Sequence, residues 1–82
     1  MTESILDQVR RIAADIFAVP FARVTAVSSP DTIENWDSLQ LLNLVLTLEQ
    51  TFELEFIPEE IERMINIESI SMLVQEKLSK IP

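Results

Sequence analysis

The chain of 82 residues contains no glycine, no histidine and no cysteine. Without histidine or cysteine it cannot build a Ser/His/Asp or Cys/His catalytic group, a disulfide, or the usual nitrogen and sulfur sites for zinc. Without glycine it cannot form the GxGxxG and GxxxxGK[ST] phosphate-binding loops or the ordinary calcium loop. We therefore expect no catalytic residue and no metal site, and any reactive group must be supplied from elsewhere.

Long apolar runs and an excess of basic residues are also missing. No run approaches the roughly 18 apolar residues of a transmembrane helix. The N-terminus lacks the basic segment followed by an apolar segment that is typical of a signal peptide. The net charge of −8 repels nucleic-acid phosphates and anionic lipid surfaces. We expect a cytoplasmic protein with neither nucleic acid nor membrane as partner, and a protein with a basic patch is the better candidate.

What is present suffices for one small folded domain. Apolar residues make up 48% of the chain, which argues against disorder, and there is no linker, repeat or low-complexity segment. We expect residues 1–82 to form a single domain and a monomer. The negative charge is concentrated between residues 31 and 68, a range that contains ten acidic residues and one basic residue, Arg63. Electrostatic recognition should therefore involve the middle of the chain.

Hydrophobic spacing predicts an all-α bundle of three long helices and one short one. The first helix should cover about residues 3–18, with Thr2 or Ser4 as N-cap. Pro20 ends it, and residues 19–36 form a long loop packed on the bundle through isolated apolar residues. Those expected anchors are Phe21, Val24, Val27 and Ile33.

The second helix should begin at Asp37 or Ser38 and end near Phe52. Asp37 and Gln40 have the spacing of a capping box. A rotation of 100° per residue gives a broad buried side of Leu41, Leu44, Val45, Leu48 and Phe52, with Leu42 at its margin. The polar side contains Gln40, Asn43, Thr47, Gln50 and Thr51. Leu39 and Leu46 lie at the boundary, as core-edge residues or, in a second interpretation, as contacts for a partner.

Two further helices follow. Pro58 suits the first turn of a short helix over about residues 59–65, since negative charge is favourable near a helix N-terminus. Asn66 and Ser69 both offer caps for a last helix, whose apolar residues Ile70, Leu73, Val74 and Leu78 repeat at helical spacing.

Ser38 is the residue with the most chemical interest. A serine after aspartate at a helix start is usually only part of a cap. It cannot act as a conventional nucleophile because the chain has no histidine, so a hydrolase based on Asp37 and Ser38 is a poor hypothesis. A helix N-terminus does favour a phosphate ester, because its free N–H groups and partial positive charge face the anion.

The segment N-W-D-S-L at residues 35–39, the apolar helix ending in L-E-x-x-F, the acidic E-L-E-F-I-P-E-E segment and the last amphipathic helix together resemble the acyl carrier proteins. The resemblance covers nearly the whole chain and implies the four-helix fold of that family. It implies that a phosphopantetheinyl transferase attaches 4′-phosphopantetheine from coenzyme A to Ser38. The thiol of this arm then carries acyl groups as thioesters, and the protein itself is not an enzyme.

The resemblance also implies roles for neighbouring residues. Asp37 would help to present the serine to the transferase. Acyl-activating, acyltransferase or synthase enzymes with basic patches would be the partners. We expect these enzymes to contact Leu39, Asn43, Leu46, Gln50, Glu59 and Glu60. Acyl chains would shelter in a space bordered by Leu42, Val45, Ile61 and Ile70, each of which is also an ordinary core residue.

The sequence departs from the family near the serine. Trp36 replaces the frequent glycine or alanine, and Gln40 and Asn43 are neutral where fatty-acid carriers usually have carboxylates. These differences favour a specialised pathway, such as polyketide or lipopeptide synthesis, over bulk fatty acid synthesis. A peptidyl or aminoacyl carrier protein remains an alternative within the same class, and an acidic helical interaction module without an arm is the alternative from another class.

Overall fold

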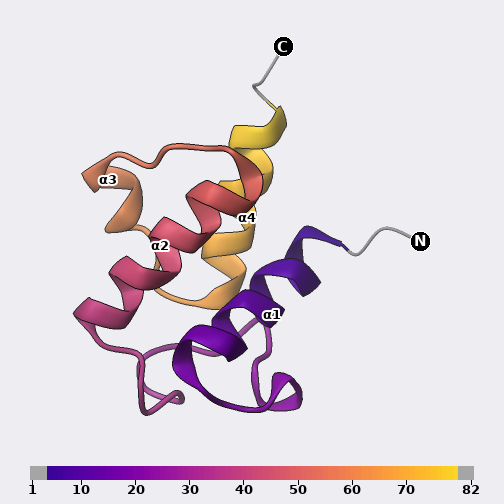
Figure 1. The fold of residues 1–82 in the computed structure, drawn as a ribbon, viewed down its shortest axis with the longest axis vertical. Helices are drawn as coiled ribbons and strands as arrows, with labels where there is room; N and C mark the ends of the chain where they lie inside the picture. The colour runs from indigo at the N-terminus through magenta and orange to yellow at the C-terminus, as the bar shows by residue number, and fades with distance from the viewer. Residues whose placement is uncertain (1–3, 80–82) are drawn as a thin grey trace.

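The computed structural model describes residues 4–79, and within this range the chain forms four α-helices, one short 3-10 helix and no strand. The helices are α1 (Ile5–Phe17), α2 (Ser38–Phe52), α3 (Pro58–Ile61) and α4 (Ile67–Ser79), and the 3-10 helix η1 spans Phe21–Arg23. Helix α1 packs against both α2 and α4, as Figure 1 shows. The predicted all-α fold with three long helices and a short third helix is confirmed.

Both ends of α1 follow from local hydrogen bonding. Ser4 is the N-cap, because its Oγ accepts the N–H of Asp7 at 3.1 Å. The alternative cap, Thr2, lies outside the described residues. At the other end, Ala18 adopts a left-handed conformation with φ 56°, which lets its N–H and that of Val19 donate to the last carbonyls of the helix. This conformation usually belongs to glycine, which the chain lacks.

The long loop between α1 and α2 is anchored partly as predicted. Val24 and Ile33 are buried in the core. The expectation for Phe21 and Val27 was wrong, because both are exposed; Phe21 instead lies beneath the guanidinium groups of Arg10 and Arg11, 4.2 Å and 5.4 Å from its ring centre. The loop carbonyls of Ala26 and Ser28 accept the N–H groups of Glu68 and Ile67 at the start of α4, so the loop and α4 support one another.

The third helix is shorter than the predicted range of residues 59–65. From Arg63 to Ile65 the chain forms tighter turns, in which each N–H donates to a carbonyl two or three positions earlier, and Met64 is buried. Helix α4 then begins at Ile67 with Asn66 as its cap: Ser69 N–H donates to Asn66 Oδ1 at 2.7 Å, and Asn66 N–H donates back to Ser69 Oγ at 3.1 Å. This reciprocal pair ends the α3 segment and fixes the start of α4.

One hydrophobic core joins the long helices. The most completely buried side chains come from α1, the loop, α2 and α4, and include Val9, Phe17, Val24, Ile33, Leu44, Leu48, Ile67, Ile70 and Val74. Helix α3 contributes only the half-buried Ile61. Its attachment to α4 is reinforced by an ion pair of 2.8 Å between Glu60 Oε1 and Lys77 Nζ.

Candidate functional site

The N-terminus of α2 presents Ser38 to solvent. Asp37 caps the helix, with its Oδ1 accepting the Gln40 N–H at 2.9 Å, and its own carbonyl accepts the Leu41 N–H at 2.9 Å. Ser38 is the first helical residue and is exposed, and its hydroxyl has no hydrogen-bond partner among residues 4–79. The hydroxyl is therefore free to react, since Asp37 already provides the helix cap.

The predicted capping box is only half formed. The side-chain oxygen of Gln40 accepts the Asn43 side-chain N–H at 2.8 Å, and the Asp37 N–H donates to the carbonyl of Asn35 at 3.1 Å. The reciprocal bond from the Asp37 N–H to Gln40 is thus absent from the described structure. The aspartate cap holds the helix start without it.

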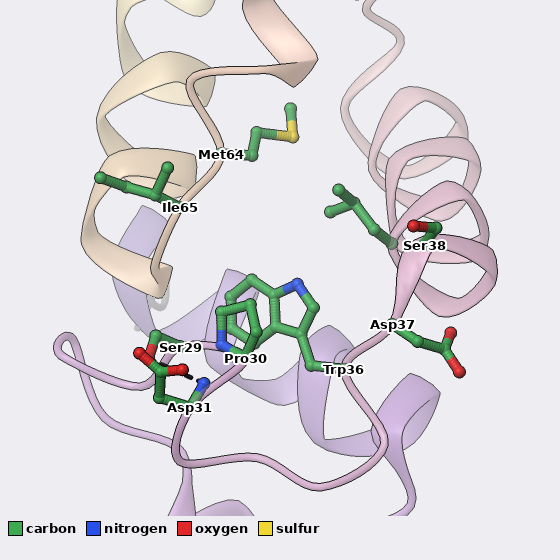
Figure 2. Close-up of a pocket in the computed structure, with 9 residues that line it drawn as sticks. Ser29, Pro30, Asp31, Trp36, Asp37, Ser38, Met64 and Ile65 are labelled. Carbon is green, nitrogen blue, oxygen red and sulfur yellow. Dashed lines mark hydrogen bonds between the residues drawn. The ribbon is translucent and has the colours of Figure 1, made fainter.

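A pocket of about 460 Å³ lies beside Ser38 (Figure 2). Its walls come from the loop before α2, the first turn of α2 and the link between α3 and α4; they are formed by Ser29, Pro30, Asp31, Trp36, Asp37, Ser38, Leu41, Met64 and Ile65. The volume is within the range of about 300–1,000 Å³ that is usual for small-molecule pockets. The site is therefore an exposed serine next to a cavity of the size of a small-molecule pocket.

Trp36 is held rigidly at this pocket. Its indole stacks on Phe17 with ring centres 4.9 Å apart and an interplanar angle of 20°, and only 6% of the residue is exposed. The preceding residue, Asn35, donates its side-chain N–H to the carbonyl of Phe17 at 2.7 Å. These contacts tie the segment before the serine to the C-terminus of α1, so α1 positions the start of α2.

Sequence reasoning did not identify Trp36, Met64 or Asn35 as parts of the site. The available signal was the large aromatic residue two positions before Ser38, which was noted only as a departure from the family. Helical periodicity cannot detect such residues, because all three lie in irregular segments.

The outer face of α2 is apolar and neutral. Leu39 is 68% exposed and Leu46 is 55% exposed, so the interpretation of these residues as core edge was wrong. Leu42 is 52% exposed, further out than the margin predicted for it. Asn43 and Gln50 are exposed on the same helix. Among residues 4–79, no element covers these three leucines on the helix that begins at Ser38.

The two glutamates expected to contact partners are in different environments. Glu59 is exposed. Glu60 is half-buried: its carboxylate pairs with Lys77 and accepts the Ile57 N–H at 2.9 Å, which caps α3. The hydrogen bond from Lys77 lowers the pKa of the Glu60 carboxyl, and the Ile57 N–H lowers it further. Glu60 is therefore engaged within the fold, whereas Glu59 is available.

The residues expected to border an acyl-chain shelter do not line the pocket beside Ser38. Val45 and Ile70 are buried in the core, Ile61 is half-buried and Leu42 is exposed. The pocket lies instead at the first turn of α2, where Leu41 is its aliphatic wall.

Other classes of site are not found in the described part of the chain. Residues 4–79 contain no cluster of three or more acidic side chains placed to hold a metal ion. Within the same range, no helix has both the length and the apolarity needed to cross a bilayer.

The fold and the site define a class of protein: a small four-helix bundle that presents one free serine at the start of its second helix. An acyl carrier protein of Coprothermobacter proteolyticus is 28% identical over 76 residues, which cover 93% of each chain. The solution structure of a holo acyl carrier protein from Geobacter metallireducens matches with a TM-score of 0.82 and 29% identity, over 92% of this chain and 86% of that one. No family model matches the chain.

In sequence and in fold, the chain is therefore similar to the acyl carrier protein family over nearly its whole length. Members of this family are carriers that work with synthase and transferase enzymes and bear a phosphopantetheine group. The residues of this chain fit such a group, because the exposed Ser38 hydroxyl opens onto the pocket at a helix N-terminus.

Proposed function

We propose that the chain carries acyl intermediates as thioesters on a 4′-phosphopantetheine arm attached to Ser38. The observation that carries this proposal is the exposed Ser38 hydroxyl, which has no partner among residues 4–79 and lies beside the pocket at the start of α2. The bound arm would supply the thiol that a chain without cysteine lacks.

In the loading step, a bond forms between Ser38 Oγ and the phosphorus atom of the pantetheine phosphate. The pyrophosphate bond of coenzyme A breaks, adenosine 3′,5′-bisphosphate leaves, and the transferase accepts the serine proton. This chain contributes the orientation of the hydroxyl. Because Asp37 caps the helix with Oδ1, Ser38 is held at the first helical position and its side chain faces outward.

We propose that partner enzymes dock on the outer face of α2. Leu39 and Leu46 would supply apolar contact, and Asn43 and Gln50 would supply uncharged hydrogen-bonding groups. Glu59 would supply negative charge for a basic patch, and Glu60 would contribute less because Lys77 already neutralises it. The neutral residues Gln40 and Asn43 on the first turns of α2 favour a specialised biosynthetic pathway over bulk fatty acid synthesis. Normal rates with fatty-acid synthase enzymes would contradict this part of the proposal.

The proposal is tested by incubation of the purified chain with coenzyme A and a broad-specificity phosphopantetheinyl transferase, followed by intact-mass measurement. We expect the wild-type chain to gain one 4′-phosphopantetheine and the Ser38→Ala variant to gain none. No gain by the wild type would favour an interaction module without an arm. Loading with acyl or aminoacyl groups by dedicated ligases would then separate an acyl carrier from a peptidyl or aminoacyl carrier.

A further inference from the structure

The indole of Trp36 is nearly buried but has an unused hydrogen-bond donor. Among residues 4–79, no atom accepts a hydrogen bond from the Trp36 Nε1–H. In that range, every side-chain nitrogen or oxygen that is fully buried has a hydrogen-bond partner. Because the Trp36 nitrogen has no partner, it must be accessible at the surface of the pocket. Figure 2 shows the nitrogen facing the space between Met64 and Ser38. A tryptophan N–H can only donate, and a buried one usually finds an acceptor.

The walls around this donor are apolar, and the rim is negative. Leu41 and Met64 line the pocket together with the indole. The rim contains two carboxylates, Asp31 and Asp37, both on exposed residues. An anion in the pocket would be repelled by both carboxylates. The cavity therefore suits a neutral oxygen acceptor that is flanked by hydrocarbon.

We propose that this pocket seats the first segment of the prosthetic arm, and that the Trp36 indole N–H donates to a neutral oxygen of that segment. This inference rests on the proposed attachment at Ser38. In 4′-phosphopantetheine, the phosphate is followed by a methylene group, by a carbon that bears two methyl groups, and then by a carbon that bears a hydroxyl and by an amide carbonyl. The two methyl groups match the walls formed by Leu41 and Met64, and the hydroxyl or carbonyl oxygen matches the indole donor.

The phosphodiester itself stays outside the pocket, because it is an anion and the helix N-terminus of α2 offers it a more favourable position. Trp36 is thus a positioning residue. Trp36 limits the directions in which the arm can leave Ser38. The indole can do this because stacking on Phe17 holds it in place.

The test uses the fact that Trp36 is the only tryptophan in the chain, so the ¹⁵N-labelled protein gives a single indole N–H resonance. We expect this resonance to move downfield between the apo and holo forms by more than the backbone amides of α4 move. Exchange of the indole proton with solvent should slow, and contacts between the arm methyl protons and Leu41 or Met64 should appear in nuclear Overhauser spectra.

Intact mass, measured on the same samples, distinguishes failure of this inference from failure of the proposed function. If the chain is fully loaded and the indole resonance does not move, the arm does not occupy the pocket and the inference is wrong. A shift that appears only after acylation would also contradict it, because the cargo and not the arm would then occupy the pocket.

A matched variant, Trp36→Phe, keeps a ring that can stack on Phe17 but removes the donor. In samples of this variant whose intact mass shows complete loading, we expect weaker arm contacts with Leu41 and Met64. Undiminished contacts in this variant would show that the indole N–H has no role.

Discussion

At the scale of single residues, the absence of glycine has a structural cost. Ala18 and Glu53 close α1 and α2 in the left-handed region, with φ of 56° and 55°. For a residue with a Cβ this conformation costs about 1–2 kcal/mol. Glycine would avoid most of that cost but has a more flexible unfolded state, which costs about 0.5–1 kcal/mol.

We therefore predict that Ala18→Gly raises the free energy of unfolding by about 0.5–1 kcal/mol, measured by urea denaturation. The control is Ala22→Gly, because Ala22 is exposed and does not have a positive φ. This control variant should be less stable than the wild type. Equal effects of the two substitutions would show that the left-handed conformation of Ala18 is not strained.

Asp37 combines two roles that substitution can separate. Because it caps α2, Asp37→Ala should lower the free energy of unfolding by about 1 kcal/mol. Asp37→Asn keeps a capping oxygen, so its stability should remain close to that of the wild type. If the carboxylate also presents Ser38 to the transferase, both variants should be loaded more slowly, as measured by the time course of intact mass. Normal loading of Asp37→Asn would limit the residue to its capping role.

At the scale of secondary-structure elements, the Glu60–Lys77 ion pair holds α3 on α4. The pKa of Glu60 is lowered in the folded protein from its ordinary value of 4.5. A lowered pKa means that the unfolded chain binds a proton more readily, so the pair stabilises the fold above about pH 4.5. This contribution disappears as the pH falls through the lower, folded-state value.

We predict that Glu60→Gln is less stable than the wild type at pH 7, by at most about 1 kcal/mol, and that the difference shrinks as the pH falls below 4.5. Urea denaturation of both proteins across this range measures the effect. Glu59→Gln is the matched control, since Glu59 has no ion pair within residues 4–79 and should show no such trend. A difference that grows at low pH would contradict the assignment.

The elements also show what the sequence could predict. The start of α2 was predictable because Asp37 offers a strong cap before an apolar run. The length of α3 was not, because burial of Met64 and the hydrogen bonds between Asn66 and Ser69 depend on the position of α4. The burial of Trp36 could not be predicted from the sequence either, because its stacking partner Phe17 is far away in the chain.

The orientation of α2 depended on tertiary contacts in the same way. Rotation by 100° per residue located the core residues Leu44, Val45 and Leu48 correctly. It could not show that Leu39, Leu42 and Leu46 are exposed in the described part of the chain, because their exposure depends on where α1, α3 and α4 lie. The sequence resemblance already named Leu39 and Leu46 as partner contacts, but the exposure of these residues and of Leu42 could be established only from the folded structure.

At the scale of the whole molecule, the net charge of −8 destabilises the compact state by self-repulsion. Salt screens this repulsion, so we predict that sodium chloride raises the melting temperature by a few degrees, measured by circular dichroism. Glu55 and Glu62 are both exposed. Their substitution by glutamine should reduce the rise in melting temperature that salt causes. A melting temperature that falls with salt would show that favourable ion pairs outweigh the repulsion.

The central claim for the whole molecule is that one serine carries the arm. After loading with coenzyme A and the transferase, cleavage after glutamate releases residues 35–49, in which Ser38 is the only serine. Tandem mass spectrometry of this peptide tests the claim most directly. We predict that the peptide bears one 4′-phosphopantetheine on Ser38, and an unmodified peptide together with a modified serine elsewhere in the chain would contradict the account.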